Sequence, residues 1–126
     1  DGFKIIVSSY QDEQRKRFAI AQELGHLFLH MGYKTNAEIW EKQADKVPFQ
    51  EKDPEKVRQA NEFAAALLMP RYIFFLTLEA ASDIAESGKR TIHMQAVADF
   101  FNVSLSAAYT RAKILGLSER AYYEMS

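Results

Sequence analysis

The stretch that most constrains the fold is Arg17–His30, which reads RFAIAQELGHLFLH. Read as a helix at about 100° per residue, it places Gln22, His26 and His30 on one face, because these residues recur every four positions. Apolar side chains fill most of the other positions, so we expect the helix to be largely buried. Buried polar groups are costly unless they are paired or bound. The polar residues of this helix are therefore its most informative feature.

Residues 22–26 read QELGH, one residue away from the H-E-x-x-H signature of zinc peptidases. In that signature two histidines four residues apart hold the metal, and the glutamate activates the metal-bound water. Here the first histidine is replaced by Gln22. Its neutral amide is a weak zinc ligand beside imidazole or carboxylate, so the substitution removes most of one ligand bond.

Length and composition indicate a single domain, residues 1–126, whose net charge of −1 argues against coating nucleic acid or membranes by electrostatics alone. The absence of cysteine excludes disulfides, cysteine-type zinc sites and thiol nucleophiles. No run reaches the roughly 18 apolar residues of a membrane span. We therefore expect a cytoplasmic protein with no membrane partner. Because the chain begins at Asp1 without Met, we also expect it to be a piece of a longer protein.

Local patterns predict an α+β fold that is mostly helical, with a small N-terminal sheet. The β-branched run of residues 3–8 predicts a strand, and residues 11–31 predict the central helix. Residues 33–52 are polar and aperiodic, which indicates a long loop with Trp40 as a packing anchor.

The sequence Asp53-Pro54-Glu55 predicts the start of a second long helix that ends near Met69. Its apolar stripe includes Val57, and its small alanines allow the central helix to approach closely. Residues 72–81 predict a short apolar helix, and residues 83–90 a polar connector.

Residues 91–117 predict a C-terminal helix-turn-helix-like hairpin, with Asn102 in the turn and Ser104 capping the second helix. Only Arg111 and Lys113 supply charge on that second helix. A DNA-recognition helix would normally carry more phosphate-binding and base-reading side chains. We therefore interpret the hairpin as structural and do not expect nucleic acid as a partner.

Together these motifs resemble the ImmA/IrrE family of metallo-endopeptidases. RFAIAQELGHLFLH, QANEFAAALLMP and FFNVSLSAAYTRAKILGL stand in the family's order, and the resemblance covers residues 3–117. It implies a zincin-like fold in a cytoplasmic bacterial, phage or mobile-element protein. It also implies an activity of the family, the zinc-dependent cleavage of helix-turn-helix repressors.

The resemblance assigns Glu23 to the general base and His26 to the second zinc-binding histidine. Gln22 falls on the first zinc-binding histidine, and Val57, three residues before Ala60, falls on the third ligand, a glutamate. A catalytic zinc site needs three protein ligands and an open position. With two of the three replaced, we expect Glu23 to be vestigial and no zinc to be bound.

A rebuilt metal site is the alternative, because His26 and His30 are themselves four residues apart and would hold a metal displaced by about 6 Å. Its oxygen ligand would come from Glu62, Glu55 or Glu38. Glu62, however, lies about 140° around its helix from the expected third-ligand position. His93 stands alone and is expected at the surface or in a helix cap. A laboratory substitution would explain Gln22 but not Val57, which favours natural degeneration.

Three functions follow from these patterns. The first is a non-catalytic relative, a pseudoprotease, that binds a partner protein such as a helix-turn-helix repressor or related regulator. In it, Gln22, Glu23 and His26 would form one hydrogen-bonded network. The second is an active zinc endopeptidase with unusual ligands. The third is a DNA-associated regulatory module whose duplex binding depends on Arg111.

Overall fold

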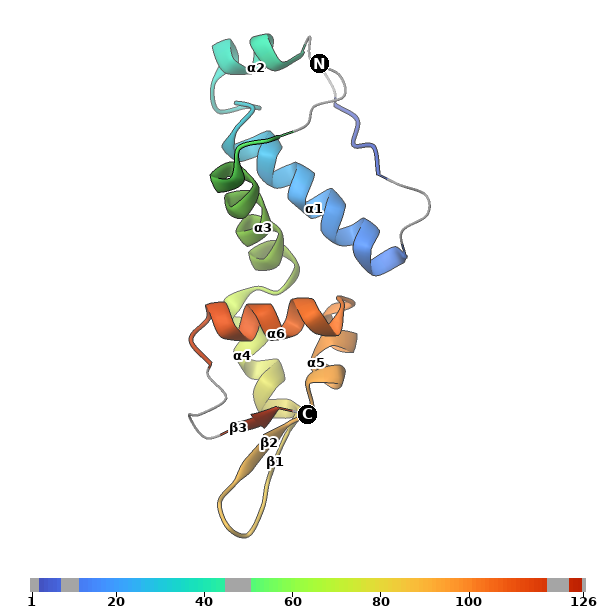
Figure 1. The fold of residues 1–126 in the computed structure, drawn as a ribbon, viewed down its shortest axis with the longest axis vertical. Coiled ribbons are helices and arrows are strands. Elements are labelled where there is room, and N and C mark those ends of the chain that lie inside the picture. Colours follow the sequence, from blue (N-terminus) through green and yellow to red (C-terminus); the bar gives the residue numbers. More distant parts are fainter. Residues whose placement is uncertain (1–2, 8–11, 45–50, 118–122, 126) are drawn as a thin grey trace. The chain divides into compact units, whose positions relative to one another are not determined.

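The computed structural model describes residues 3–7, 12–44, 51–117 and 123–125. The chain divides into two compact units, residues 1–67 and 68–126, and each is described by itself. The described residues form six helices and one three-stranded sheet, which confirms the predicted α+β class with a mostly helical content (Figure 1).

The central helix of the first unit is α1 (Glu13–Leu29). The Asp12 carboxylate accepts a hydrogen bond from the Arg15 backbone N–H at 2.8 Å, which satisfies one of the free N–H groups at the helix start. The chain leaves the helix through Gly32 at φ 76°, where a Cβ atom would lie 2.6 Å from the Asn36 carbonyl oxygen. The predicted helix and its glycine stop are confirmed. The expectation that the helix is largely buried is wrong: of its residues only Ala21, Gly25, His26 and Leu27 are buried, whereas Ile20, Phe28 and Leu29 are exposed.

The second long helix, α3 (Pro54–Leu68), packs against α1 at Gly25 (Figure 1). A Cβ atom on this glycine would lie 3.1 Å from the Cα atom of Ala60 and equally close to Phe63. Ala60 and Ala64 are fully buried, so the small residues allow the close approach that the sequence predicted. At the helix start, the Asp53 carboxylate accepts from the Glu55 N–H at 3.0 Å.

Two predictions for the first unit are wrong. Residues 3–7 form no strand. A strand needs a paired neighbour, and the described residues of this unit contain no other strand; Phe3 instead packs edge-on against Tyr33 at 5.1 Å. The expected loop of residues 33–52 contains the helix α2 (Ala37–Ala44). The predicted role of Trp40 as a packing anchor is confirmed, because its ring lies 5.0 Å from that of Tyr33.

The second unit begins with α4 (Arg71–Ala80), as predicted, followed by the sheet. Strands β1 (Ser82–Ile84) and β2 (Arg90–Ile92) pair antiparallel, and β3 (Tyr123–Met125) pairs parallel to β2. The polar connector expected at residues 83–90 is therefore a β-hairpin, and the small sheet lies in the second unit rather than at the N-terminus. A sheet of three-residue strands leaves almost no periodicity in the sequence.

The helix pair of the second unit follows the prediction closely. Helix α5 (Met94–Phe101) ends at Asn102 in the left-handed conformation, and the Ser104 hydroxyl caps α6 (Leu105–Ile114) by accepting from the Ala107 N–H at 3.1 Å. The core beside this pair includes Phe74 of α4, stacked on Phe101 at 5.7 Å.

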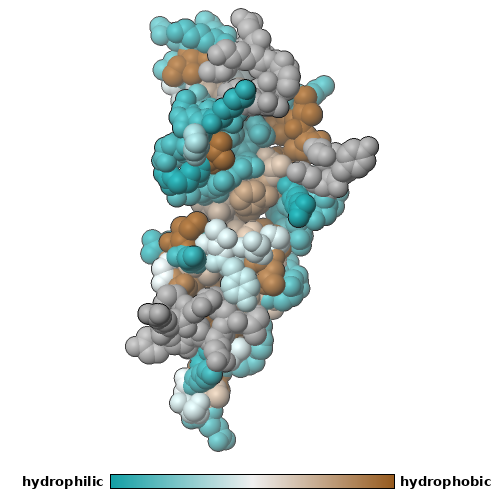
Figure 2. Space-filling model, in the orientation of Figure 1, coloured by the Kyte–Doolittle hydropathy of each residue, from teal (hydrophilic) through white to brown (hydrophobic). Residues whose placement is uncertain are grey.

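Surface character varies across the molecule, and Figure 2 shows hydrophobic residues set among hydrophilic ones. Tyr72 and Leu76 of α4 and Phe100 of α5 are among the exposed large hydrophobic residues. Within the described residues, no single helix has both the length and the apolar composition needed to cross a membrane.

Candidate functional site on helices α1 and α3

The first part of the site joins Gln22 of α1 to Asn61 of α3. The Nε2 group of Gln22 donates a hydrogen bond to the Oδ1 atom of Asn61. Gln22 is half-buried and Asn61 is exposed, so the pair lies at the edge of the helix contact. Asn61 lies one turn after Val57, which is half-buried and offers no polar atom from its side chain. Gln22, at the position that the resemblance assigns to the first zinc-binding histidine, thus bonds to the side-chain amide of Asn61.

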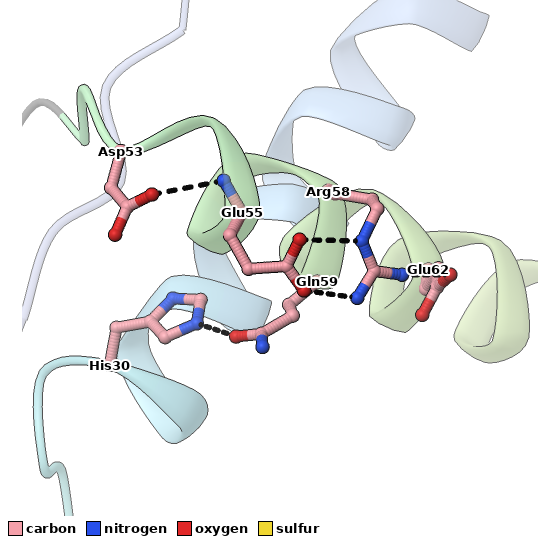
Figure 3. A network of polar contacts seen from close by, with 6 residues as sticks. All are labelled: His30, Asp53, Glu55, Arg58, Gln59 and Glu62. Atoms are coloured by element: carbon pink, nitrogen blue, oxygen red, sulfur yellow. Dashed lines mark hydrogen bonds and ion pairs between the residues drawn. The ribbon is translucent and has the colours of Figure 1, made fainter.

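The second part joins His26 of α1 and His30, which caps the C-terminal end of α1, to Gln59 of α3. The two Nδ1 atoms of the imidazoles lie 3.0 Å apart. The Nε2 atom of His30 lies 2.7 Å from Gln59 Oε1 (Figure 3). A carbonyl oxygen only accepts, so Nε2 of His30 carries a proton. When both rings are neutral, Nδ1 of His30 therefore accepts from Nδ1–H of His26.

These two contacts flank the closest approach of the helices. In both helices, the contact of Gly25 with Ala60 lies in sequence between the residues that form the two hydrogen bonds. His26, at this contact, is 5% exposed. Burial, and then the neighbouring His30 ring, lower the pKa of His26 below its ordinary value. At neutral pH this imidazole is therefore uncharged.

Glu23 does not join either contact. It is half-buried, and within the described residues its carboxylate makes no hydrogen bond or ion pair. Burial raises the pKa of this carboxyl above its ordinary value, because the charged form loses hydration. The single network expected for Gln22, Glu23 and His26 is wrong: the polar groups of α1 bond to α3 and to His30 rather than to one another.

Two of the three glutamates proposed for a rebuilt metal site are engaged elsewhere. Glu55 and Glu62 both pair with Arg58 along the exposed face of α3 (Figure 3). The hydrogen bond from Arg58 is the main reason that the pKa of Glu55 is lowered, and these carboxylates raise the pKa of the guanidinium. Glu38 is exposed on α2. The prediction that Glu62 points away from the expected site agrees with this pairing.

The donor set does not fit zinc. His26 is the one imidazole at an expected ligand position, Gln22 supplies only a neutral amide oxygen there, and the side chain of Val57 is apolar. In the part of the chain that the structure describes, no three His, Asp or Glu side chains are grouped to hold a metal. A catalytic zinc centre takes three nitrogen, sulfur or carboxylate ligands, and this arrangement supplies one of them.

The remaining singled-out residues lie outside the site. His93 is at the surface, where its Nε2 atom lies 2.7 Å from Asp83 Oδ2, as its expected surface position required. Arg111, on which the DNA-associated alternative depends, is buried in the second unit. It is 7% exposed and donates from Nε to the Met69 carbonyl at 3.1 Å. Lys113 is exposed.

Sequence reasoning missed two residues of the site, Gln59 and Asn61. Both stand in the quoted stretch QANEFAAALLMP, as its first and third residues, and that stretch is the available signal. A single glutamine or asparagine on a helix is otherwise ordinary surface composition.

A glutamate and a histidine at H-E-x-x-H spacing, on a helix crossed by a second helix, are typical of a metallopeptidase-like domain. The model of the peptidase M78 family, described as the IrrE N-terminal-like domain, matches residues 4–113. The chain therefore belongs to this family, as the resemblance implied. No match was found among curated proteins or among solved structures.

Proposed function

We propose that this chain is a non-catalytic member of its family, a pseudoprotease that binds a partner protein without cutting it. The observation that carries the proposal is the hydrogen bond from Gln22 to Asn61. At the position expected to hold the first metal ligand stands a neutral amide, whose NH₂ group bonds to the neighbouring helix and whose oxygen is only a weak zinc ligand. Val57 is apolar at the position expected to hold the third ligand.

Loss of the metal donors removes the chemistry but leaves the scaffold. Without a bound ion, nothing lowers the pKa of the attacking water from ~15.7 toward ~7, and Glu23 alone does not activate it. The helix contact at Gly25 and the capped ends of α1 and α3 are nevertheless intact. A retained surface with a lost reaction favours binding as the present use of the site.

The family resemblance supplies the class of partner to test first, a helix-turn-helix transcriptional repressor or related regulator. The experiment incubates the chain with zinc and each candidate repressor from the native host, then measures complex formation by size-exclusion chromatography and cleavage by mass spectrometry. We expect a complex and no new peptide ends. Absence of any complex overturns the binding function.

The runner-up function is an endopeptidase with unusual ligands, supported by the His26–His30 pair, whose Nδ1 atoms lie 3.0 Å apart. It predicts cleavage that depends on added metal and disappears in the Glu23→Gln variant. Repressor cleavage with this dependence would replace the pseudoprotease proposal.

A further inference from the structure

The Gln22–Asn61 pair holds unused hydrogen-bonding capacity. Each side-chain amide has one carbonyl oxygen and one NH₂ group, and the bond between them uses one group of each residue. Within the described residues, the other two groups, Gln22 Oε1 and Asn61 Nδ2, have no partner. The pair therefore presents one acceptor and one donor.

This complementarity does not depend on which amide donates. If both amides were turned over, Asn61 would donate to Gln22, and the remaining groups would again be one NH₂ and one carbonyl oxygen. Asn61 is exposed and Gln22 is half-buried, so the free groups lie at the surface edge of the helix contact.

A polypeptide in extended conformation offers the matching groups. In a strand, a single residue presents its N–H and its C=O on the same edge, and antiparallel neighbours exchange both bonds there. A helix uses these groups internally and has none to offer along its length. The ligand that matches the amide pair is therefore an extended segment, held by its main chain.

We propose that the Gln22–Asn61 pair binds the main chain of an extended segment of the partner protein, accepting from its N–H and donating to its C=O. This rests on the proposed function and adds how the partner is held. No bond in the ligand forms or breaks.

Asn61→Asp separates recognition from scaffold. The aspartate keeps an oxygen to accept from Gln22 Nε2 but has no NH₂ group to donate to a ligand. Gln95→Ala is the matched control, because this amide lies on α5 and donates to Asp99, outside the site. Thermal unfolding of each variant verifies that the fold is kept.

The probe is an array of short overlapping peptides that cover the helix-turn-helix repressors of the native host. The best-binding peptide is titrated against each variant by fluorescence anisotropy. We expect Asn61→Asp to bind about tenfold more weakly, which corresponds to the loss of about one net hydrogen bond to a polar partner. Gln95→Ala should bind as the unaltered chain does. Methylating the peptide nitrogen at one position should weaken binding to the unaltered chain by a similar factor.

Full affinity in Asn61→Asp would overturn the inference, as would equal binding of every N-methylated peptide. Binding of an intact repressor without binding of any peptide would overturn the inference and leave the proposed function standing. Failure of both intact repressors and peptides to bind would overturn both.

Discussion

The side-chain amide of Gln22 on α1 donates a hydrogen bond to the side-chain carbonyl of Asn61 on α3. This contact joins the two helices at the position where a zinc peptidase of this family would be expected to hold its metal. In the proposed function, this direct bond between amides stands in place of one mediated by an ion, and the site is a metal-independent contact.

The Gln22–Asn61 bond should contribute measurably to stability. In a double-mutant cycle with Gln22→Ala and Asn61→Ala, we expect a coupling free energy of about 0.5–1.5 kcal/mol, because one intramolecular hydrogen bond is removed by either change. Urea unfolding of the four proteins measures it. Strictly additive effects would mean that the two amides do not interact in solution.

Gly25→Ala should destabilise the fold, even though alanine favours helix more than glycine does. The added Cβ atom would lie 3.1 Å from the Ala60 backbone, which cannot retreat without moving α3. We expect a loss of about 1–3 kcal/mol in the free energy of unfolding. A gain of about 1 kcal/mol, the value expected from helix propensity alone, would show that the helices are less closely packed.

Stability should fall as the pH drops below about 6.5, the ordinary pKa of histidine. The lowered pKa of His26 means that the unfolded chain binds a proton in this window and the folded chain does not, so acid favours unfolding. Above about pH 6.5 the titration of His26 does not change the free energy of unfolding. That free energy decreases as the pH falls from about 6.5 to the lowered pKa of His26 in the folded chain. Urea midpoints between about pH 7.5 and 5.5 should show a shallower fall in His26→Asn, and equal slopes would contradict the assignment.

Glu23→Gln should stabilise the protein near neutral pH. Burial raises the pKa of this carboxyl, so its charged form in the folded state is disfavoured, and the cost appears as the pH rises through the raised value. Because Glu23 is only half-buried, we expect a gain below about 1 kcal/mol. Thermal unfolding at pH 7.5 and at acid pH measures it. A loss of stability in the variant would reveal an unrecognised partner of Glu23.

Arg111→Ala should weaken the second unit without testing any DNA contact. The variant leaves the Met69 carbonyl without its guanidinium donor and opens space in the core, at a cost of about 1–3 kcal/mol. Lys113→Ala, on the exposed face of the same helix, is the control and should change stability little. Equal effects of the two substitutions would contradict the buried role of Arg111.

The helices could be predicted because residues next to each helix in the sequence determine where it begins. Asp12, Asp53 and Ser104 each accept a hydrogen bond from a backbone N–H at the start of the following helix, which is the chemistry that such residues favour. The strands could not, because strand pairing is decided by a distant partner. Residues 3–7 have a strand composition without such a partner, whereas the three residues of β1 pair with β2.

The candidate site was predicted only on its α1 side. Gln22, His26 and His30 share a face, and a four-residue period is enough to place them there. Their partners on α3, Asn61 and Gln59, follow from how the helices cross at Gly25, and no local pattern encodes that crossing. The resemblance assigns the third ligand to the position of Val57, and it gives no role to Asn61, which lies one turn further on.

Zinc content tests most directly whether the site is independent of metal. The chain is purified without chelators, dialysed against excess zinc, desalted and measured by mass spectrometry. The double variant Gln22→His with Val57→Glu serves as the positive control, because it restores the full donor set. We expect less than about a tenth of an equivalent in the unaltered chain and about one equivalent in the double variant. About one equivalent of zinc in the unaltered chain, lost on His26→Ala, would contradict the pseudoprotease proposal and favour the endopeptidase function.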